Sequence, residues 1–399
     1  MTTTVETITG PAQAMVLNMG PQHPSTHGVL RVILEMDGEI VLKAKPVIGY
    51  LHTGIEKSCE SKTYSQCITL TDRIDYLAPL SNNLGFCLAA EKIIGIEVPK
   101  RAQYIRVLLT ELTRITSHLV WLGTHAIDLG AMTVFLYSFR EREEIMKIYE
   151  YVSGQRMMTS YFRIGGLALE PPPDWLDRVR RVIDALPAHI DEYEALLTGN
   201  RIWQARTKGV GYMSPEDAIA IGASGPLLRA SGVSYDIRKV FPYSSYDEFD
   251  FKVQTAAAGD CYARYQVRVA EIRESIKIVR QAMERIPPTG PFRADAPGII
   301  PPSREEMKTS IEGLIYHFKI FTEGFPAPPG QVYQAIESPR GELGVFMVSD
   351  GSPKPYRVKF RTPSFVNLQS LPKLCEGRLI ADVVACIGTT DIVLGEVDR

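Results

Sequence analysis

Residues 101–130 read RAQYIRVLLTELTRITSHLVWLGTHAIDLG, and this stretch decides the fold. Its apolar side chains recur at steps of three and four, which predicts one long helix. A second stripe on the same helix is polar: Glu111, Arg114, His118, Trp121, His125 and Asp128. Because few residues on any side suit water, we expect the helix to be central and the ionisable stripe to be at least partly buried.

The ionisable stripe leaves two interpretations open. Burying a lone charge costs several kcal/mol, so Glu111, Arg114 and His118 either satisfy one another in a structural network or face a polar cavity. Asp128 differs from them, since the following Leu129-Gly130 indicates that the helix ends or kinks there. A carboxyl group at such a helix end can pass a proton to a neighbour.

Strand and helix patterns flank this helix on its N-terminal side. Residues 30–45, LRVILEMDGEIVLKAK, alternate apolar and polar side chains around Asp37-Gly38, which predicts a hairpin with a two-residue turn. Residues 64–156 have a helical pattern with a break at residues 95–100.

The C-terminal half carries further helix signals and then strands. Helix starts are predicted at Asp174 and at Ser214, and residues 262–286 show the most regular helical periodicity of the chain. A capping box at Ser303 and Glu306 predicts a helix that runs through about Phe321. Beyond Pro329 the pattern changes to strands and loops: VYQAIES, GVFMVSD and YRVKFRT.

Together these patterns predict an α+β fold, with a central α-helical bundle and antiparallel β regions at both the N-terminal and the C-terminal side. We expect an N-terminal β region over 1–60, a helical core over 61–290, and a C-terminal helix plus β and loop region over 291–399. The Pro-rich junctions at 170–173 and 287–302 are expected to separate layers and not independent domains, so the three regions are expected to form one integrated domain.

Composition excludes several classes of function. With 44 basic and 46 acidic residues the chain has no excess charge for nucleic acid or for anionic lipid. No uncharged apolar run reaches the ~18 residues that span a bilayer, and the first ten residues lack the pattern of a secretion signal. The six cysteines form no CxxC pair, so we expect buried free thiols and no self-held metal cluster.

Two histidines lie four residues apart in NMGPQHPSTHGVLR, residues 18–31. The flanking prolines and glycines predict a loop beside the hairpin. His23 and His27 are either a pair of metal ligands or ordinary loop histidines. No third or fourth ligand is identifiable, so the residues alone leave the choice open.

Several long motifs in this chain resemble one family. They are the loop of residues 18–31, YLHTGIEK from Tyr50, TYSQCITLTDRIDYLAP from Thr63, THAIDLGAMT from Thr124, GPLLRASGVSYDIRK from Gly225, SPRGELGVFMVSDGSPKPYRVKFRTPSF from Ser338 and GTTDIVLGEVDR from Gly388. The family is the D-type, or 49 kDa-type, subunit of NADH-quinone oxidoreductase, which is respiratory complex I. It is similar in fold to the large subunit of [NiFe] hydrogenases, so the resemblance implies a [NiFe] hydrogenase large-subunit-like architecture.

The hydrogenases hold nickel with two CxxC pairs, one in RICGxC and one in DPCxxC. The matching segments here are RIDYLA from Arg73 and DIVLGE from Asp391. Asp75 and Ala78 stand at the first two cysteine positions, and Val393 and Glu396 stand at the second two. All four thiolates are missing, so we predict no metal site. The resemblance implies that the emptied cavity receives a quinone headgroup.

The resemblance also implies roles for single residues. His27 and Tyr76 are expected to be the hydrogen-bond partners of the two quinone carbonyls, with His23 on the same quinone-binding loop. Asp128 is expected to be the acid behind His27. An imidazole and a phenol both donate hydrogen bonds while neutral or nearly so, which suits a substrate that takes up two electrons and two protons.

The resemblance implies that this chain by itself binds no cofactor. Electrons from NADH reach the quinone through a [4Fe-4S] cluster in a neighbouring subunit, and the reduction to quinol is coupled to proton translocation. The expected partners are the B-type Fe-S protein, the C-type and I-type subunits and the H-type membrane subunit of the complex, with no nucleic acid. The expected location is peripheral, at the cytoplasmic side of the inner (plasma) membrane.

One departure from the family and two other interpretations stay open. Many members read HRGxEK where this chain has Thr53 in HTGIEK, so an arginine expected near the cluster interface is missing. A hydrogenase-like metalloenzyme and a non-catalytic scaffold remain the alternative functions. Glu337, Arg340 and Glu342 are expected to form ion pairs either with partner subunits or with the central helix.

Overall fold

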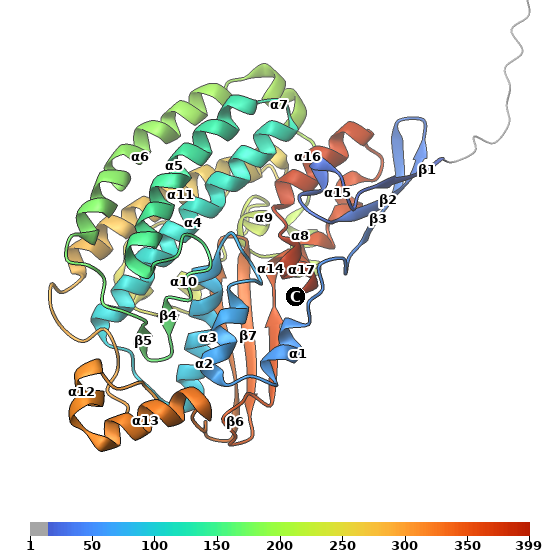
Figure 1. Ribbon diagram of the computed structural model, residues 1–399. Coiled ribbons are helices and arrows are strands. Elements are labelled where there is room, and N and C mark those ends of the chain that lie inside the picture. Colours follow the sequence, from blue (N-terminus) through green and yellow to red (C-terminus); the bar gives the residue numbers. More distant parts are fainter. Residues whose placement is uncertain (1–14) are drawn as a thin grey trace, which may run out of the picture.

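The computed structural model describes residues 15–399 (Figure 1). The first ten residues, on which the secretion argument rests, lie outside this range. The described chain is mostly helical, with small antiparallel sheets near its N-terminal and C-terminal sides. This confirms the predicted α+β class.

Helix α4 (Lys100–Asp128) runs through the middle of the molecule (Figure 1). Nearly all of its side chains from Ile105 to Ala126 are buried, the charged ones included. It packs against α5 (Met132–Ser153) and α11 (Cys261–Arg285), with α3 (Pro79–Ile94) and α16 (Ile380–Thr390) also in contact. The prediction of a central helix with a buried ionisable stripe is therefore confirmed.

The helical region that begins at Tyr64 contains more breaks than its pattern indicates. The predicted interruption lies at residues 95–99, between α3 and α4. A further break, at residues 72–78 after α2 (Tyr64–Thr71), was not predicted, whereas the break at residues 129–131 after α4 lies where Leu129-Gly130 indicated it. These two breaks matter for the site, because one contains Tyr76 and the other directly follows Asp128.

The N-terminal sheet is formed by β1 (Met15–Met19), β2 (Arg31–Asp37) and β3 (Ile40–Val47), in that order. The hairpin is confirmed, but Asp37 pairs with Ile40, so its turn residues are Gly38 and Glu39, one position later than predicted. Gly38 has φ +56°, a conformation that suits glycine at this turn. The buried face of the sheet packs on α15 (Leu371–Cys375).

The C-terminal sheet has the order β6 (Gly330–Ser338), β7 (Gly341–Ser349) and β8 (Arg357–Arg361), all antiparallel, as the strand patterns predicted. The helix predicted from Ser303 through Phe321 is two helices. α12 (Arg304–Thr309) ends at Ser310, whose hydroxyl caps α13 (Ile311–Thr322) by accepting from the Gly313 amide at 3.1 Å. A second N-cap signal inside the predicted helix accounts for this difference.

The remaining elements connect these layers. α6 (Trp175–Leu197) and α8 (Pro215–Ala220) begin where Asp174 and Ser214 predicted, and α11 covers the predicted periodic stretch. The others are η1 (Pro24–Thr26), α1 (Ile55–Cys59), β4 (Phe162–Arg163), β5 (Gly166–Leu167), α7 (Arg201–Thr207), α9 (Gly225–Arg229), α10 (Ile237–Val240), η2 (Tyr246–Glu248), α14 (Pro363–Leu368) and α17 (Leu394–Asp398). Across residues 15–399, no helix is both long and apolar enough to cross a membrane.

Candidate functional site

The loop histidine His27 meets the end of the central helix. Its Nε2 is hydrogen-bonded to Oδ2 of Asp128 at 2.6 Å, although the two residues are 101 positions apart. Their side chains are 13% and 8% exposed, so the pair lies at the edge of the core. The loop after η1 and the end of α4 together create this contact.

Helix α16 closes against the end of α4 behind this pair. A Cβ at Gly388 would lie 2.5 Å from Nδ1 of His125 and 3.2 Å from Oδ2 of Asp128, so only glycine allows the approach. Trp121 of α4 holds the two helices together here, because its Nε1 donates to the Gly388 carbonyl of α16 at 2.7 Å. Burial lowers the pKa of His125 to about 3, so this ring is neutral. The ionisable stripe contained His125, but sequence reasoning did not place it beside the site.

His23 lies on the same loop and has a local structural contact. Its Nδ1 accepts a hydrogen bond of 3.2 Å from the Ser25 amide, which caps the short helix η1. The side chain is otherwise exposed. His23 therefore shapes the turn that presents His27.

Tyr76 lies in the break before α3 and is brought toward the His27 loop by α17. A Cβ at Gly395 would lie 3.4 Å from Cε1 of Tyr76, and a Cβ at Gly28 would lie 3.2 Å from Cδ1 of Leu394. Consecutive residues of α17 thus touch the tyrosine ring and the residue after His27. Burial, with the nearby charge of Asp75, raises the pKa of Tyr76, so its phenol keeps its proton.

A buried ion cluster lies next to Tyr76. The Arg340 guanidinium pairs with Asp75 through Nη1, and its Nη2 lies 3.3 Å from Oδ1 of Asp391. Its Nε also donates to the Asp391 carbonyl at 2.9 Å. Glu396 lies close enough to this cluster for its pKa to respond to the charges of Asp75 and Arg340. The cluster joins the break after α2, the β6–β7 turn and the segment before α17.

The residues at the four hydrogenase cysteine positions do not fit nickel. Asp75, Ala78, Val393 and Glu396 are all buried, and none offers a thiolate. Asp75 instead neutralises a guanidinium, whose positive charge disfavours a metal cation nearby. The six cysteines are free and buried. Within residues 15–399, no group of three or more His, Cys, Asp or Glu side chains is arranged to hold a metal ion.

Glu396 holds a proton in the folded protein. Burial, together with the charge of Asp75, raises its pKa to about 8 against the opposing effect of Arg340. Its Oε2 accepts from the Ser364 amide at 3.0 Å. The carboxyl group is therefore neutral at pH 7.

The protonation of Glu396 predicts a pH-dependent stability. Glutamate normally titrates near 4.5, so between pH 4.5 and about 8 the folded chain holds a proton that the unfolded chain has released. Stability then falls as pH rises through this window, by up to about 1.4 kcal/mol per pH unit. Glu396→Gln cannot titrate, so we expect it to gain stability relative to the native chain from pH 5 to pH 8. Urea unfolding of both chains at these two pH values measures the difference, and an equal difference at both would contradict the prediction.

The last residues of α17 also hold the loop that contains Thr53. Asp398 accepts from the Gly49 amide at 2.8 Å and from the Leu51 amide at 2.7 Å, and His52 Nδ1 donates to its carbonyl at 2.7 Å. Thr53 itself is exposed. One short helix therefore touches Tyr76, the His27 loop and the Thr53 loop.

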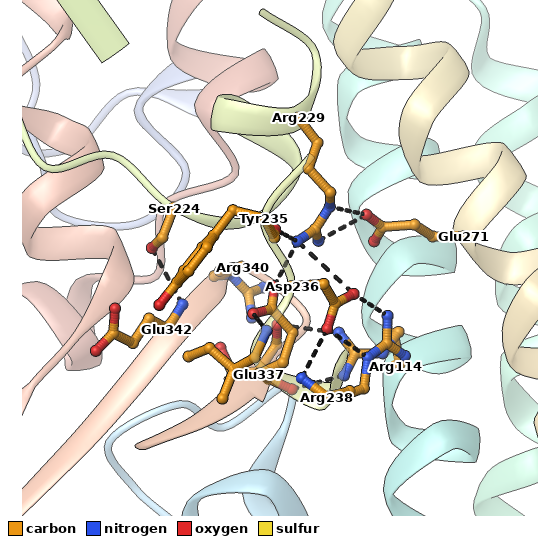
Figure 2. Close-up of polar contacts among 12 residues, drawn as sticks. Arg114, Ser224, Arg229, Tyr235, Asp236, Arg238, Glu271, Glu337, Arg340 and Glu342 are labelled. Carbon is orange, nitrogen blue, oxygen red and sulfur yellow. Dashed lines mark hydrogen bonds and ion pairs between the residues drawn. The ribbon is translucent and has the colours of Figure 1, made fainter. Parts of the chain in front are cut away.

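The rest of the ionisable stripe belongs to a buried structural network, part of which, around Arg114, Arg229 and Arg238, is drawn in Figure 2. Arg238 bridges Glu111 at 3.1 Å and Asp236 at 2.6 Å. His118 lies 3.0 Å from Glu271, which also pairs with Arg229 at 2.7 Å. Burial alone would raise the pKa of Glu271, but Arg229 and His118 lower it to about 2. Of the two interpretations left open, the structural network is the one observed for Glu111 and Arg114, whereas His118 joins it through Nε2 and its buried Nδ1 has no hydrogen-bond partner.

The SPRGE segment belongs to the same interior. Arg114 donates to the carbonyls of Glu337 at 2.6 Å and Ser338 at 3.0 Å, and the Glu337 carboxylate pairs with Arg229 at 2.7 Å (Figure 2). The carboxylate of Glu342 accepts from the Tyr333 hydroxyl at 2.8 Å. The expected ion pair with the central helix is not formed: Glu337 meets Arg114 only through its backbone carbonyl, and its carboxylate pairs with Arg229 of α9 instead.

Comparison with known proteins gives a consistent result. Residues 128–399 match the family model described as the respiratory-chain NADH dehydrogenase 49 kDa subunit. The chain is 66% identical over 385 residues to the first D-type NADH-quinone oxidoreductase subunit of Solibacter usitatus (strain Ellin6076), covering 96% of this chain and 94% of that protein. It is 63% identical to the second D-type subunit of Koribacter versatilis (strain Ellin345) over 98% of this chain and 97% of that protein. The D-type subunit of Geotalea uraniireducens (strain Rf4) is 59% identical, with 97% and 99% covered.

Proposed function

Because the chain belongs to the family of the respiratory-chain NADH dehydrogenase 49 kDa subunit, and so is a subunit of NADH-quinone oxidoreductase, we propose that His27, Tyr76 and Asp128 form its quinone-reduction site. The proposal depends above all on one observation, the 2.6 Å contact between His27 and Asp128. A loop imidazole and a helix-end carboxylate that meet across 101 residues form an acid-base pair at the edge of the core.

The residue types support this chemistry. Two electrons and two protons convert a quinone to a quinol, and negative charge grows on both carbonyl oxygens before the protons arrive. With the acid proton on Asp128 and the ring proton on Nδ1, His27 donates from Nδ1 to one oxygen and gives that proton up, while its Nε2 takes the proton of Asp128, so the ring stays neutral. Tyr76 donates to the other oxygen. Its raised pKa keeps the phenol protonated until that oxygen has become basic enough to take the proton.

Electrons come from outside the chain in this proposal. A [4Fe-4S] cluster in a neighbouring subunit, fed by NADH, passes them to the quinone, and the reduction is coupled to proton translocation. The exposed loop around Thr53, held by Asp398, faces the cluster-bearing subunit. With Thr53 in place of the family's arginine, that interface lacks the charge, and any modification, that the arginine would carry.

The finer architecture is also part of the proposal. We infer a [NiFe] hydrogenase large-subunit-like fold that acts as one integrated domain over 1–60, 61–290 and 291–399. The B-type Fe-S protein, the C-type and I-type subunits and the H-type membrane subunit are its partners, and it lies peripherally on the cytoplasmic side of the inner (plasma) membrane. His23 contributes to quinone binding by fixing the turn before His27.

The variant Asp128→Asn tests the acid-base pair. The amide keeps the shape of the carboxylate but holds no exchangeable acid proton, so we expect quinone reduction by the assembled complex to fall by about tenfold. NADH oxidation with a water-soluble acceptor that takes electrons before the quinone serves as the internal control and should not change. If quinone turnover also stays unchanged in a fully assembled variant, the pair has no catalytic role and a scaffold function is favoured.

A further inference from the structure

Helix α13 lies in a region of the molecule remote from α16 and α17 (Figure 1). Its large apolar side chains are exposed. Only Gly313 and Ile320 of its twelve residues are buried. The residues that follow steps of three and four, the spacing of a core-facing stripe, are instead exposed by 51% to 75%. We call them the α13 face: Ile311, Leu314, Ile315, Phe318 and Phe321.

The size of the α13 face exceeds what an isolated chain needs. Its five large side chains expose an area on the order of 500 Å², near the upper end of apolar patches on monomeric proteins. A standard protein interface buries about 800 Å² on each partner, so the α13 face could supply more than half of the area that one partner buries. Exposing this apolar surface to water is unfavourable, and a second surface that covers it would remove that cost.

A cavity beside the α13 face adds a charge preference. Its volume is about 310 Å³, and its apolar wall includes Ile68, Ile164, Leu167, Ile300 and Phe321. Two guanidinium groups, Arg163 and Arg293, also line it. Neither is in an ion pair within residues 15–399, and Arg293 donates only to backbone carbonyls, at 2.9 Å to Leu167 and also to Ala168. Burial and the charge of Arg163 lower the pKa of Arg293.

We propose that the α13 face and this cavity dock an apolar segment of another subunit of the same complex, and that this segment carries a carboxylate which pairs with Arg163 and Arg293. Family membership shows that the chain works among other subunits. An unpaired pair of cations beside an apolar surface is complementary to an acidic apolar segment. This surface is separate from the quinone site, so the two proposals stand or fall independently.

The charges around α13 argue against other occupants. Residues 304–323 carry four glutamates and three cations, which does not favour an anionic membrane surface. A second copy of the chain would bring the same patch against itself, so that the two arginine pairs would face one another. A different protein with a carboxylate avoids both forms of repulsion.

Photo-crosslinking in the assembled complex identifies the occupant. The full chain with a benzophenone amino acid at position 318 is incorporated into the complex, irradiated and analysed by mass spectrometry. We expect a crosslink to an apolar peptide of another subunit that contains Asp or Glu. A crosslink to phospholipid, a crosslink to a second copy of this chain, or the absence of any crosslink in intact complex would each overturn the proposal.

Variants of the α13 face test whether docking matters for assembly. We expect Phe318→Glu to lower the amount of this chain in the complex at least tenfold, because a charge would be buried in the interface. Phe241→Glu is the matched control, since Phe241 is 66% exposed and Phe318 64%, and it should assemble normally. Circular dichroism of both isolated variants checks that they fold. A folded Phe318→Glu chain that assembles like the control would contradict the proposal.

The paired charge is tested separately. Arg163→Glu together with Arg293→Glu should weaken assembly at least fivefold, and exchanging the crosslinked partner's acidic residue for arginine should restore it. Failure of this rescue, with the partner known, would overturn the assignment of the carboxylate to this cavity. Turnover of whatever complex does assemble should remain normal, which separates this result from a defect at the quinone site.

Discussion

Replacing Tyr76 with phenylalanine is expected to lower quinone reduction by the assembled complex about 100-fold or more. The variant loses one hydroxyl group and keeps the ring that packs against Gly395. In the proposed mechanism that hydroxyl both stabilises charge on a quinone oxygen and delivers a proton, and each role is worth about two orders of magnitude in enzymes where it has been removed. Steady-state turnover with a short-chain quinone measures the loss.

Tyr262→Phe is the matched control for this experiment. Its hydroxyl donates to the Thr198 carbonyl at 3.1 Å, away from α17 and the His27 loop, so turnover should be unchanged. Assembly of the Tyr76→Phe complex should also be normal, because Tyr76 takes part in none of the ion pairs described above. Native turnover in an assembled Tyr76→Phe complex would remove Tyr76 from the site and leave His27 without its proposed counterpart.

Replacing Arg340 with methionine is expected to destabilise the chain by about 3–5 kcal/mol. The side chain is buried, and its guanidinium compensates both Asp75 and Asp391. Its removal leaves Asp75 without its cation beside the already neutral Glu396, and leaves Asp391 with only the more distant Arg268, whose Nε lies 3.8 Å from Oδ2. Denaturant unfolding of the isolated chain measures the change, and the variant should also accumulate poorly in the complex.

Two comparisons separate this effect from the loss of any arginine. Arg180→Met removes an exposed pair with Asp177 at 2.7 Å and should cost at most about 1 kcal/mol. Adding Asp75→Asn to Arg340→Met should recover part of the lost stability, since one uncompensated charge is removed with it. If the Arg340 and Arg180 variants were equally stable, the cluster would not hold this part of the fold together.

Local patterns predicted much of the fold. The central helix, the N-terminal hairpin and the three C-terminal strands follow from periodicity and turn residues, which act over short distances along the chain. The errors lie where two local signals compete. Ser310 starts a new helix within a periodic stretch, and the hairpin turn moved by one residue so that glycine occupies its first position.

The site was less accessible to sequence reasoning. Position and residue type singled out Asp128 as a helix-end carboxylate, but only the family resemblance linked it with His27 and Tyr76. Nothing local in the sequence predicts that α17 brings Tyr76 and the His27 loop together, or that Arg340 compensates Asp75. These contacts depend on how distant elements pack, and Glu396 becomes a protonated group only through that packing.

The great sequence separation of the contacts around the site has a consequence for how the chain folds. His27 and Asp128 are 101 residues apart, Asp75 and Arg340 are 265 apart, and Leu51 and Asp398 are 347 apart. Closing such long loops is entropically slow, so contacts of this kind form late in folding. Helices of the bundle can form early, whereas the contacts around the proposed quinone site form only when the two halves of the chain have joined. A stalled or kinetically trapped chain would therefore have native-like helix content but would lack the contact between His27 and Asp128.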